Sequence, residues 1–277
     1  MRLPAVFKSG IVLVVLGIGF VYSCNKPPAN SSLGNDDNGG YASDASRIEL
    51  FTDDAISLMD IAGTYFTPDY IADSTLATVT WDTIDEPRTL QVIFSATQDA
   101  TCLDGRKRRG SVSVTYSGRY SDTGTANIHN ITFNNYYVDG YQVSGTIQYV
   151  RIDTTVIGNW YYQVYVNDSV TITPGSYVTW NGTMLRQWIA GDSTATRTDD
   201  VFSISGNPTL MRPDMHRFTF SIAAPWQVAL NYNYVEAGSA NIAGPQGART
   251  INYGNGYTDN IAQLYFGGNE YTISLSY

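Results

Sequence analysis

The sequence predicts an all-β fold, a long-stranded antiparallel meander arranged as a sandwich or a partly closed sheet, with one short N-terminal helix. Three observations support this prediction. The composition is poor in strong helix formers, with three Lys and four Glu against 21 Tyr and 25 Gly. From Thr75 onward, apolar and polar residues alternate with the period of strands that have one solvated face. Turn signals containing Gly, Asn and Asp separate these segments.

The first residues have the pattern of an export signal. Arg2 and Lys8 precede an apolar run of 11 residues, Ile11–Val21. As a helix this run spans roughly 16 Å, about half of the ~30 Å hydrocarbon core of a bilayer. A basic start, a short apolar run and a small residue before the cut site are typical of a cleaved signal, so we expect residues 1–23 to be removed.

Ser23-Cys24, directly after this run, resembles a lipobox, although Val21-Tyr22 is bulkier than the usual lipobox residues. The resemblance implies that Cys24 carries palmitate-type acyl chains and holds the protein at the outer membrane, facing the periplasm or the cell surface. Two or three acyl chains anchor a protein stably, at about 0.8 kcal/mol per buried CH₂. The alternative is an ordinary secretory signal in which Cys24 has no role.

The segment Asn25–Asp44 is rich in Pro, Asn, Ser, Gly and Asp, which bury too little apolar surface to offset the entropy of ordering. We therefore expect residues 24–44 to form a lipidated, flexible tether and residues 45–277 to form the β domain. Two weakly similar strand–loop–strand segments suggest a division of that domain into halves near residues 155–175.

Loss of the signal leaves 14 basic and 25 acidic residues, which moves the net charge from −9 to about −11. This charge argues against nucleic acid as a partner. Once Cys24 is lipidated only Cys102 remains, so we expect no disulfide within the chain.

One segment, Ser46–Ala62, has apolar residues at helical spacing, with Ser46 or Thr52 placed to cap it. We expect this helix to pack one face against an end or a face of the sheet. Farther on, Asp139-Gly140 predicts a type I′ hairpin and Pro174-Gly175 a type II turn. His129-Asn130 interrupts the alternation as a β-bulge would.

No catalytic site is predicted. The chain has two histidines, no paired-cysteine metal spacing and no Gly-x-Ser-x-Gly motif. Asp199-Asp200 is the obvious carboxylate doublet for a glycoside hydrolase, but neighbours on a strand point to opposite faces. We expect a protein that is not an enzyme and that has no metal or other cofactor.

Three sets of residues are candidate surface sites. Arg106, Lys107, Arg108 and Arg109 could bind an anionic glycan or a lipid phosphate, although charge runs are more often solvated hairpin ends. Tyr161 and Tyr165 have the opposite parity to Val164 and could stack on a glycan from the solvated face. Five Asp-Ser/Thr triplets resemble the O-glycosylation motif of exported Bacteroidota proteins, which implies modification at Ser74, Thr83, Thr154, Ser169 and Ser193.

Three longer segments carry a family resemblance. DGRKRRGSVSVTYSGRY (104–120), ITFNNYYVDGYQVSGT (131–146) and RTINYGNGYTDNIAQLYFGGNEYTISL (249–275) are similar to segments of uncharacterised β-rich Bacteroidota lipoproteins. In that family a cysteine often stands where this chain has Thr258, so a thiol partner for Cys102 is absent here. The resemblance implies location and β-richness, and it brings no activity with it.

These patterns predict a cell-envelope lipoprotein that acts as a non-catalytic binding or structural module. Its expected partners are the membrane, through the lipid anchor, and a glycan or an envelope protein. The alternatives are a surface adhesin or fimbrial-type subunit, a glycoside hydrolase, or an outer-membrane β-barrel. The barrel is suggested by the alternating apolar residues that end in Tyr277.

Overall fold

The computed structural model describes residues 39–65, 67, 76–124, 127–152, 160–194, 196–256 and 258–276. The predicted signal, Cys24, residues 25–38 of the predicted tether, Ser74 and Thr154 lie outside these residues. Within the described residues, no helix combines the length and the apolar character needed to cross a membrane.

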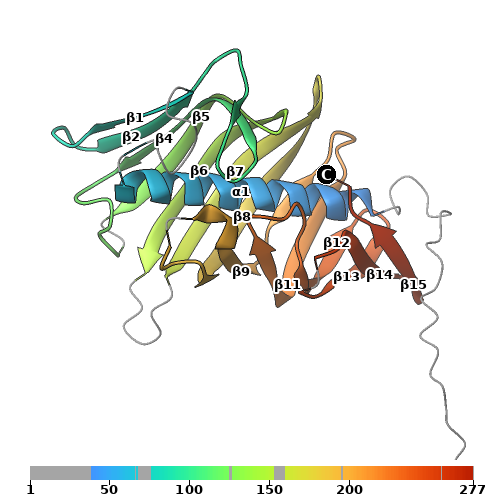
Figure 1. Ribbon diagram of the computed structural model, residues 1–277. Coiled ribbons are helices and arrows are strands. Elements are labelled where there is room, and N and C mark those ends of the chain that lie inside the picture. Colours follow the sequence, from blue (N-terminus) through green and yellow to red (C-terminus); the bar gives the residue numbers. More distant parts are fainter. Residues whose placement is uncertain are drawn as a thin grey trace, which may run out of the picture.

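The described chain forms one α-helix, α1 (Gly40–Tyr65), and a single 15-stranded sheet in which the paired strands are antiparallel (Figure 1). The predicted all-β antiparallel meander is therefore confirmed. The strands are β1 (Ala77–Asp82), β2 (Arg88–Phe94), β3 (Ala100–Thr101), β4 (Lys107–Tyr116), β5 (Ile128–Val138), β6 (Tyr141–Ile152), β7 (Tyr161–Thr173), β8 (Ser176–Ala190), β9 (Val201–Gly206), β10 (Thr209–Met211), β11 (Arg217–Ala229), β12 (Ala237–Gly244), β13 (Gly247–Asn255), β14 (Ile261–Phe266) and β15 (Asn269–Ser274).

The strand order follows the chain with few departures. β4 to β8 and β11 to β15 are each neighbours in sequence order, while β9 and β10 both lie between β8 and β11. β6 and β7 pair from Val143↔Val170 to Ile152↔Tyr161, so the sheet is continuous across the region where the sequence suggested two halves.

The helix lies inside the curve of this sheet. In Figure 1, α1 runs between the early strands above it and the later strands below it. Every residue from Tyr41 to Gly63 is buried. The helix begins at Gly40, six residues before the predicted start, so Gly40–Asp44 belong to the helix and not to a flexible tether. It is also buried all round, whereas the sequence predicted one buried face.

Contact with the last strand accompanies the early helix start. Gly39 has φ +79, and a Cβ atom placed on it would lie 2.6 Å from Ile273 Cδ1 of β15. Only glycine tolerates both the backbone conformation and the close approach. The entry to α1 therefore packs directly on the C-terminal edge of the sheet.

Strand alternation produces the core as predicted. Trp180 of β8 is fully buried and packs edge-on to Phe220 at a ring separation of 5.5 Å. The hairpin at Asp139-Gly140 has φ values of 50 and 88, as a type I′ turn requires, and Gly175 has φ 79, as expected for the predicted type II turn.

The predicted bulge at His129-Asn130 is wrong. His129 pairs in regular register with Tyr149, and its buried ring stacks on the Tyr149 ring at 4.6 Å. The register shifts of β5 lie elsewhere, opposite Gly110 of β4 and between Thr132 and Tyr136. His129 interrupts the apolar pattern because it is a polar side chain on the inner face.

Candidate functional site

Ion pairs to α1 come from several parts of the sheet. The helix carries five buried acidic residues, and four of them are paired with arginines from other elements. These arginines come from the start of β4, from β6, from β8 and from the β10–β11 turn, and one comes from a short 3₁₀ helix, η2 (Arg197–Asp199). The acidic residues are Asp44, Glu49, Asp53, Asp54 and Asp60. The arginines are Arg106, Arg108, Arg151, Arg186, Arg197 and Arg212.

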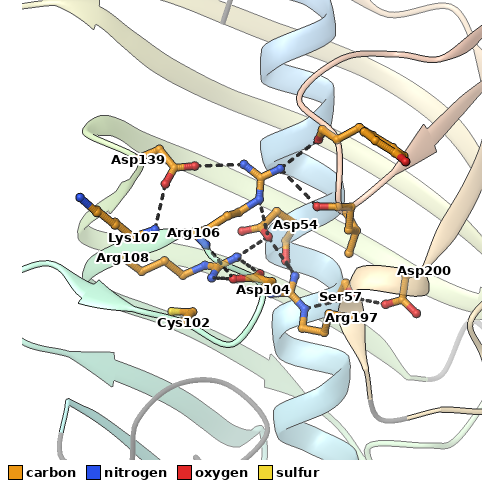
Figure 2. A network of polar contacts seen from close by, with 12 residues as sticks. Asp54, Ser57, Cys102, Asp104, Arg106, Lys107, Arg108, Asp139, Arg197 and Asp200 are labelled. Atoms are coloured by element: carbon orange, nitrogen blue, oxygen red, sulfur yellow. Dashed lines mark hydrogen bonds and ion pairs between the residues drawn. The ribbon is translucent and has the colours of Figure 1, made fainter. Parts of the chain in front are cut away.

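Asp54 is the centre of the largest cluster, drawn in Figure 2. Its Oδ1 atom accepts hydrogen bonds from Arg108 and, at 2.9 Å, from Arg197. Both guanidinium groups also donate to Asp104, at 2.7 and 2.8 Å. Burial by itself raises the pKa of Asp54, but the charges of Arg108, Arg197 and Arg106 outweigh burial and hold the pKa below its usual value.

The predicted run of four cations is divided between the two faces of β4. Arg106 and Arg108 point inward to Asp54, and Arg106 also donates to Asp139 at 3.1 Å. Lys107 points outward and is exposed. Arg109 pairs with Asp99 at 3.0 Å. The four side chains therefore do not form one exposed anion-binding tip, because strand alternation sends every second one toward the helix.

A second cluster surrounds Asp60 near the end of α1. Its Oδ1 atom accepts hydrogen bonds from Tyr120 at 3.1 Å, Tyr149 at 2.9 Å and Arg151 at 2.8 Å. Burial lowers the pKa of the neighbouring His129 to about 4, so its ring is neutral at pH 7. These residue types occur in acid–base catalysis, but all of them are buried. Their hydrogen bonds fix the end of the helix to β6.

Three other buried carboxyl groups have weaker compensation. Burial raises the pKa of Asp168 to about 7, and its partner is the Thr52 hydroxyl at 2.8 Å. Burial also raises the pKa of Asp200 to about 6, with Ser57 donating at 3.0 Å. Glu49 accepts from the Trp180 indole at 2.8 Å, and burial raises its pKa well above normal. Asp168 is therefore partly protonated at neutral pH.

The remaining predicted residues occupy separate places. Tyr161 is half-buried and Tyr165 is 40% exposed, both on the outer face of β7. Thr83 and Ser193 are exposed, whereas Ser169 is half-buried and bonded to Ser144 at 2.9 Å. Cys102 is a buried free thiol.

The Asp199-Asp200 doublet does not form a carboxylate pair. Asp200 is buried against Ser57, while Asp199 accepts from the exposed Thr194. In the described part of the chain, no group of three or more His, Cys, Asp or Glu residues is arranged to hold a metal ion.

An open groove of about 790 Å³ lies on the sheet between β11 and β15. Strand pairing places five of its lining residues in one row across five strands. The row consists of Ser221, Asn241, Thr250, Tyr265 and Glu270. Since neighbouring strands lie about 4.8 Å apart, the row spans roughly 19 Å. We call this feature the outer groove.

Small residues leave the outer groove hollow. Ala243 and Ala248 pair with each other beside the polar row and are exposed. Thr250 donates to Asn241 at 3.0 Å, which fixes two members of the row. Tyr265 is 41% exposed, and partial desolvation together with the Glu270 carboxylate raises the pKa of its hydroxyl.

No sequence pattern indicates the outer groove, because each of its residues is ordinary in a strand and only the register brings them into one row. Comparison with protein-family models, with curated proteins and with solved structures found no match. The resemblance to Bacteroidota lipoproteins therefore stays a prediction.

Replacing Asp54 tests the helix clusters. In Asp54→Ala the buried guanidinium groups of Arg108 and Arg197 lose one of the two carboxylates that they share and keep Asp104. We expect the free energy of unfolding to fall by about 3–5 kcal/mol. The matched control is Asp99→Ala, which removes a partly exposed ion pair with Arg109 and is expected to cost at most about 1 kcal/mol. Urea unfolding followed by tryptophan fluorescence measures both; equal losses would contradict the clusters' role.

The raised carboxyl pKa values predict a pH dependence of stability. Because Asp168 titrates near 7 when folded and near 3.9 when unfolded, the folded state binds more protons between these values. Its contribution is full at low pH and is lost as pH rises, by up to about 1.4 kcal/mol per pH unit. Asp168→Asn should flatten the fall of stability between about pH 5 and pH 7.

The exposed Asp192→Asn is the matched control for this measurement. Thermal unfolding across the pH range should show a smaller slope for Asp168→Asn and an unchanged slope for Asp192→Asn. An unchanged slope in both variants would show that the pKa of Asp168 is the same in the folded and unfolded states.

Proposed function

We propose that this chain is a non-catalytic binding module of the cell envelope, attached by a lipid on Cys24, and that its outer groove binds carbohydrate. The observation that carries the proposal is the row of hydrogen-bonding side chains from Ser221 to Glu270 across five strands. Hydroxyl, amide and carboxylate groups at regular spacing can pair with the hydroxyl groups of successive sugars, which are both donors and acceptors.

The filled interior of the sheet favours the outer surface as the place where a ligand binds. The curve of the sheet is filled by α1, whose residues from Tyr41 to Gly63 are buried. The outer groove, in contrast, is open and has an aromatic ring, Tyr265, at its side. An exposed aromatic face with convergent polar groups suits a sugar ring.

Charge favours a neutral glycan over an acidic one. Glu270 ends the polar row, and the full chain carries a net charge of −9. Among the described residues, the lining holds one cation, Arg249, beside Glu270, so an anionic sugar would be disfavoured mainly by the negative charge of the whole molecule. The buried partners of Arg106 and Arg108 also remove those two cations from an anion site on the surface.

Truncating Tyr265 tests the outer groove. Tyr265→Ala removes the ring at the side of the groove. Because one aromatic stacking contact is lost, we expect about tenfold weaker binding to neutral polysaccharides. Tyr177→Ala removes an equally large exposed ring, 56% exposed at the start of β8, and should leave binding unchanged. Binding of the full chain to an array of neutral, sulfated and phosphorylated glycans measures the effect.

Two outcomes would contradict the proposal: no binding to any neutral glycan, or equal binding by the two variants.

The second candidate function is an assembling adhesin or fimbrial-type subunit. It is supported by the strand order, in which β1 and β15 are the two ends of the described sheet. Sheet ends can pair with another chain. An SDS-resistant ladder without glycan binding would favour that candidate.

A further inference from the structure

Two loops meet at the end of β12 to β14 that lies away from the outer groove. The loop before β12 contributes residues 231–234 and Glu236, and the loop before β14 contributes residues 258–260. Together they line a pocket of about 200 Å³, which we call the loop pocket. All eight of its lining residues carry side-chain oxygen: two are tyrosines, and the other six are Asn231, Asn233, Glu236, Thr258, Asp259 and Asn260.

Glu236 is the unusual member of the loop pocket. The residue is 6% exposed, and its buried Oε1 atom has no hydrogen-bond partner in the described part of the chain. The buried carboxylates of α1 differ, since Asp54 and Asp60 meet arginines and Glu49 meets the Trp180 indole. A buried carboxylate oxygen without a partner is costly, and burial raises the pKa of Glu236 accordingly. A ligand that supplies positive charge would remove this cost.

Two further side chains of the loop pocket, Asp259 and Asn260, are held by hydrogen bonds that leave part of each group available. Asp259 accepts from the Ile261 backbone N–H through Oδ1, at 2.9 Å. Asn260 donates through its side-chain nitrogen to Ser274 at 2.9 Å and to the Leu275 carbonyl at 3.3 Å. With its nitrogen used in this way, the amide oxygen of Asn260 is free to accept.

Competing cations are already engaged. Arg106 reaches the loop before β12, where it donates to the carbonyls of Leu230 and Tyr232 at 3.4 and 3.2 Å. Its charge is balanced by Asp54 and Asp139. The described lining of the loop pocket contains no Lys or Arg.

We propose that the loop pocket binds a calcium ion through the carboxylates of Glu236 and Asp259, with amide oxygens and water completing the ligand set. Ca²⁺ takes six to eight oxygen ligands in flexible geometry, and carboxylates with amide oxygens from loops are its usual ligands. Mg²⁺ demands a small regular octahedron and retains its waters, which two carboxylates on separate loops do not provide. The site is independent of the outer groove and joins the loops before β12 and β14.

Direct titration of the full chain tests the site. Ca²⁺ should raise the unfolding temperature with a dissociation constant of about 10⁻⁴ to 10⁻³ M, the range of extracellular modules. Tb³⁺ should give luminescence when tyrosine is excited, because Tyr232 and Tyr234 line the pocket, and Ca²⁺ should displace it. In Asp259→Asn and Glu236→Gln both effects should weaken by at least about tenfold.

The matched control is Asp214→Asn. Asp214 is an exposed residue of the β10–β11 turn and, like Asp259, accepts a backbone N–H two residues later, at 3.0 Å. The Asp214→Asn variant should leave the Ca²⁺-induced rise in unfolding temperature and the Tb³⁺ luminescence unchanged. Circular dichroism checks the fold of each variant, and the exposed Asp259→Asn keeps the test valid if Glu236→Gln unfolds. No Ca²⁺ effect at millimolar concentration, or equal Tb³⁺ luminescence in all three variants, would overturn the proposal.

Discussion

The fold depends on placing positive charge around a buried acidic helix. Burying α1 removes five carboxyl groups from water, and an uncompensated buried charge is prohibitively costly. Four of the five are met by arginines, among them Arg108, Arg151 and Arg186 from three different strands. Each of these three pairings requires its strand to present the right parity inward. A register slip of one residue would turn an arginine to solvent and leave a carboxylate unpaired, so the helix selects the register of the sheet.

Selecting the strand register is a different effect of these ion pairs from adding to the free energy of unfolding. A buried ion pair is often no more stable than a well-packed apolar pair, whereas removing one partner is strongly destabilising. A meander of many similar alternating strands has several plausible registers. The charges on α1 distinguish among them at positions far apart in sequence, from Arg108 of β4, which donates to Asp54, to Ser276, whose carbonyl accepts from Arg47 at 2.9 Å. The helix therefore joins the first and last parts of the sheet.

The strands and turns could be predicted from the sequence because alternation and turn chemistry are local. The environment of α1 could not, because acidic residues on a helix ordinarily indicate a solvated face. Arg106 and Arg108 were predicted at an exposed tip for the same reason, since a charge run gives no sign of a buried partner such as Asp54. The outer groove and the loop pocket depend on register and on the meeting of two separate loops. The sequence contains their residues but not their proximity.

Because α1 fills the interior, the outer face and the loops are the surfaces left for binding. The enclosure of α1 is therefore the claim to test first. Native-state hydrogen exchange measures this enclosure residue by residue. The account predicts that backbone amides from the middle of α1, around Asp54 and Leu58, exchange only through global unfolding, with the same free energy as those of β7 and β8. Exchange of the helix amides at a much lower free energy, while the strands stay protected, would show that α1 can leave the sheet and would contradict the account.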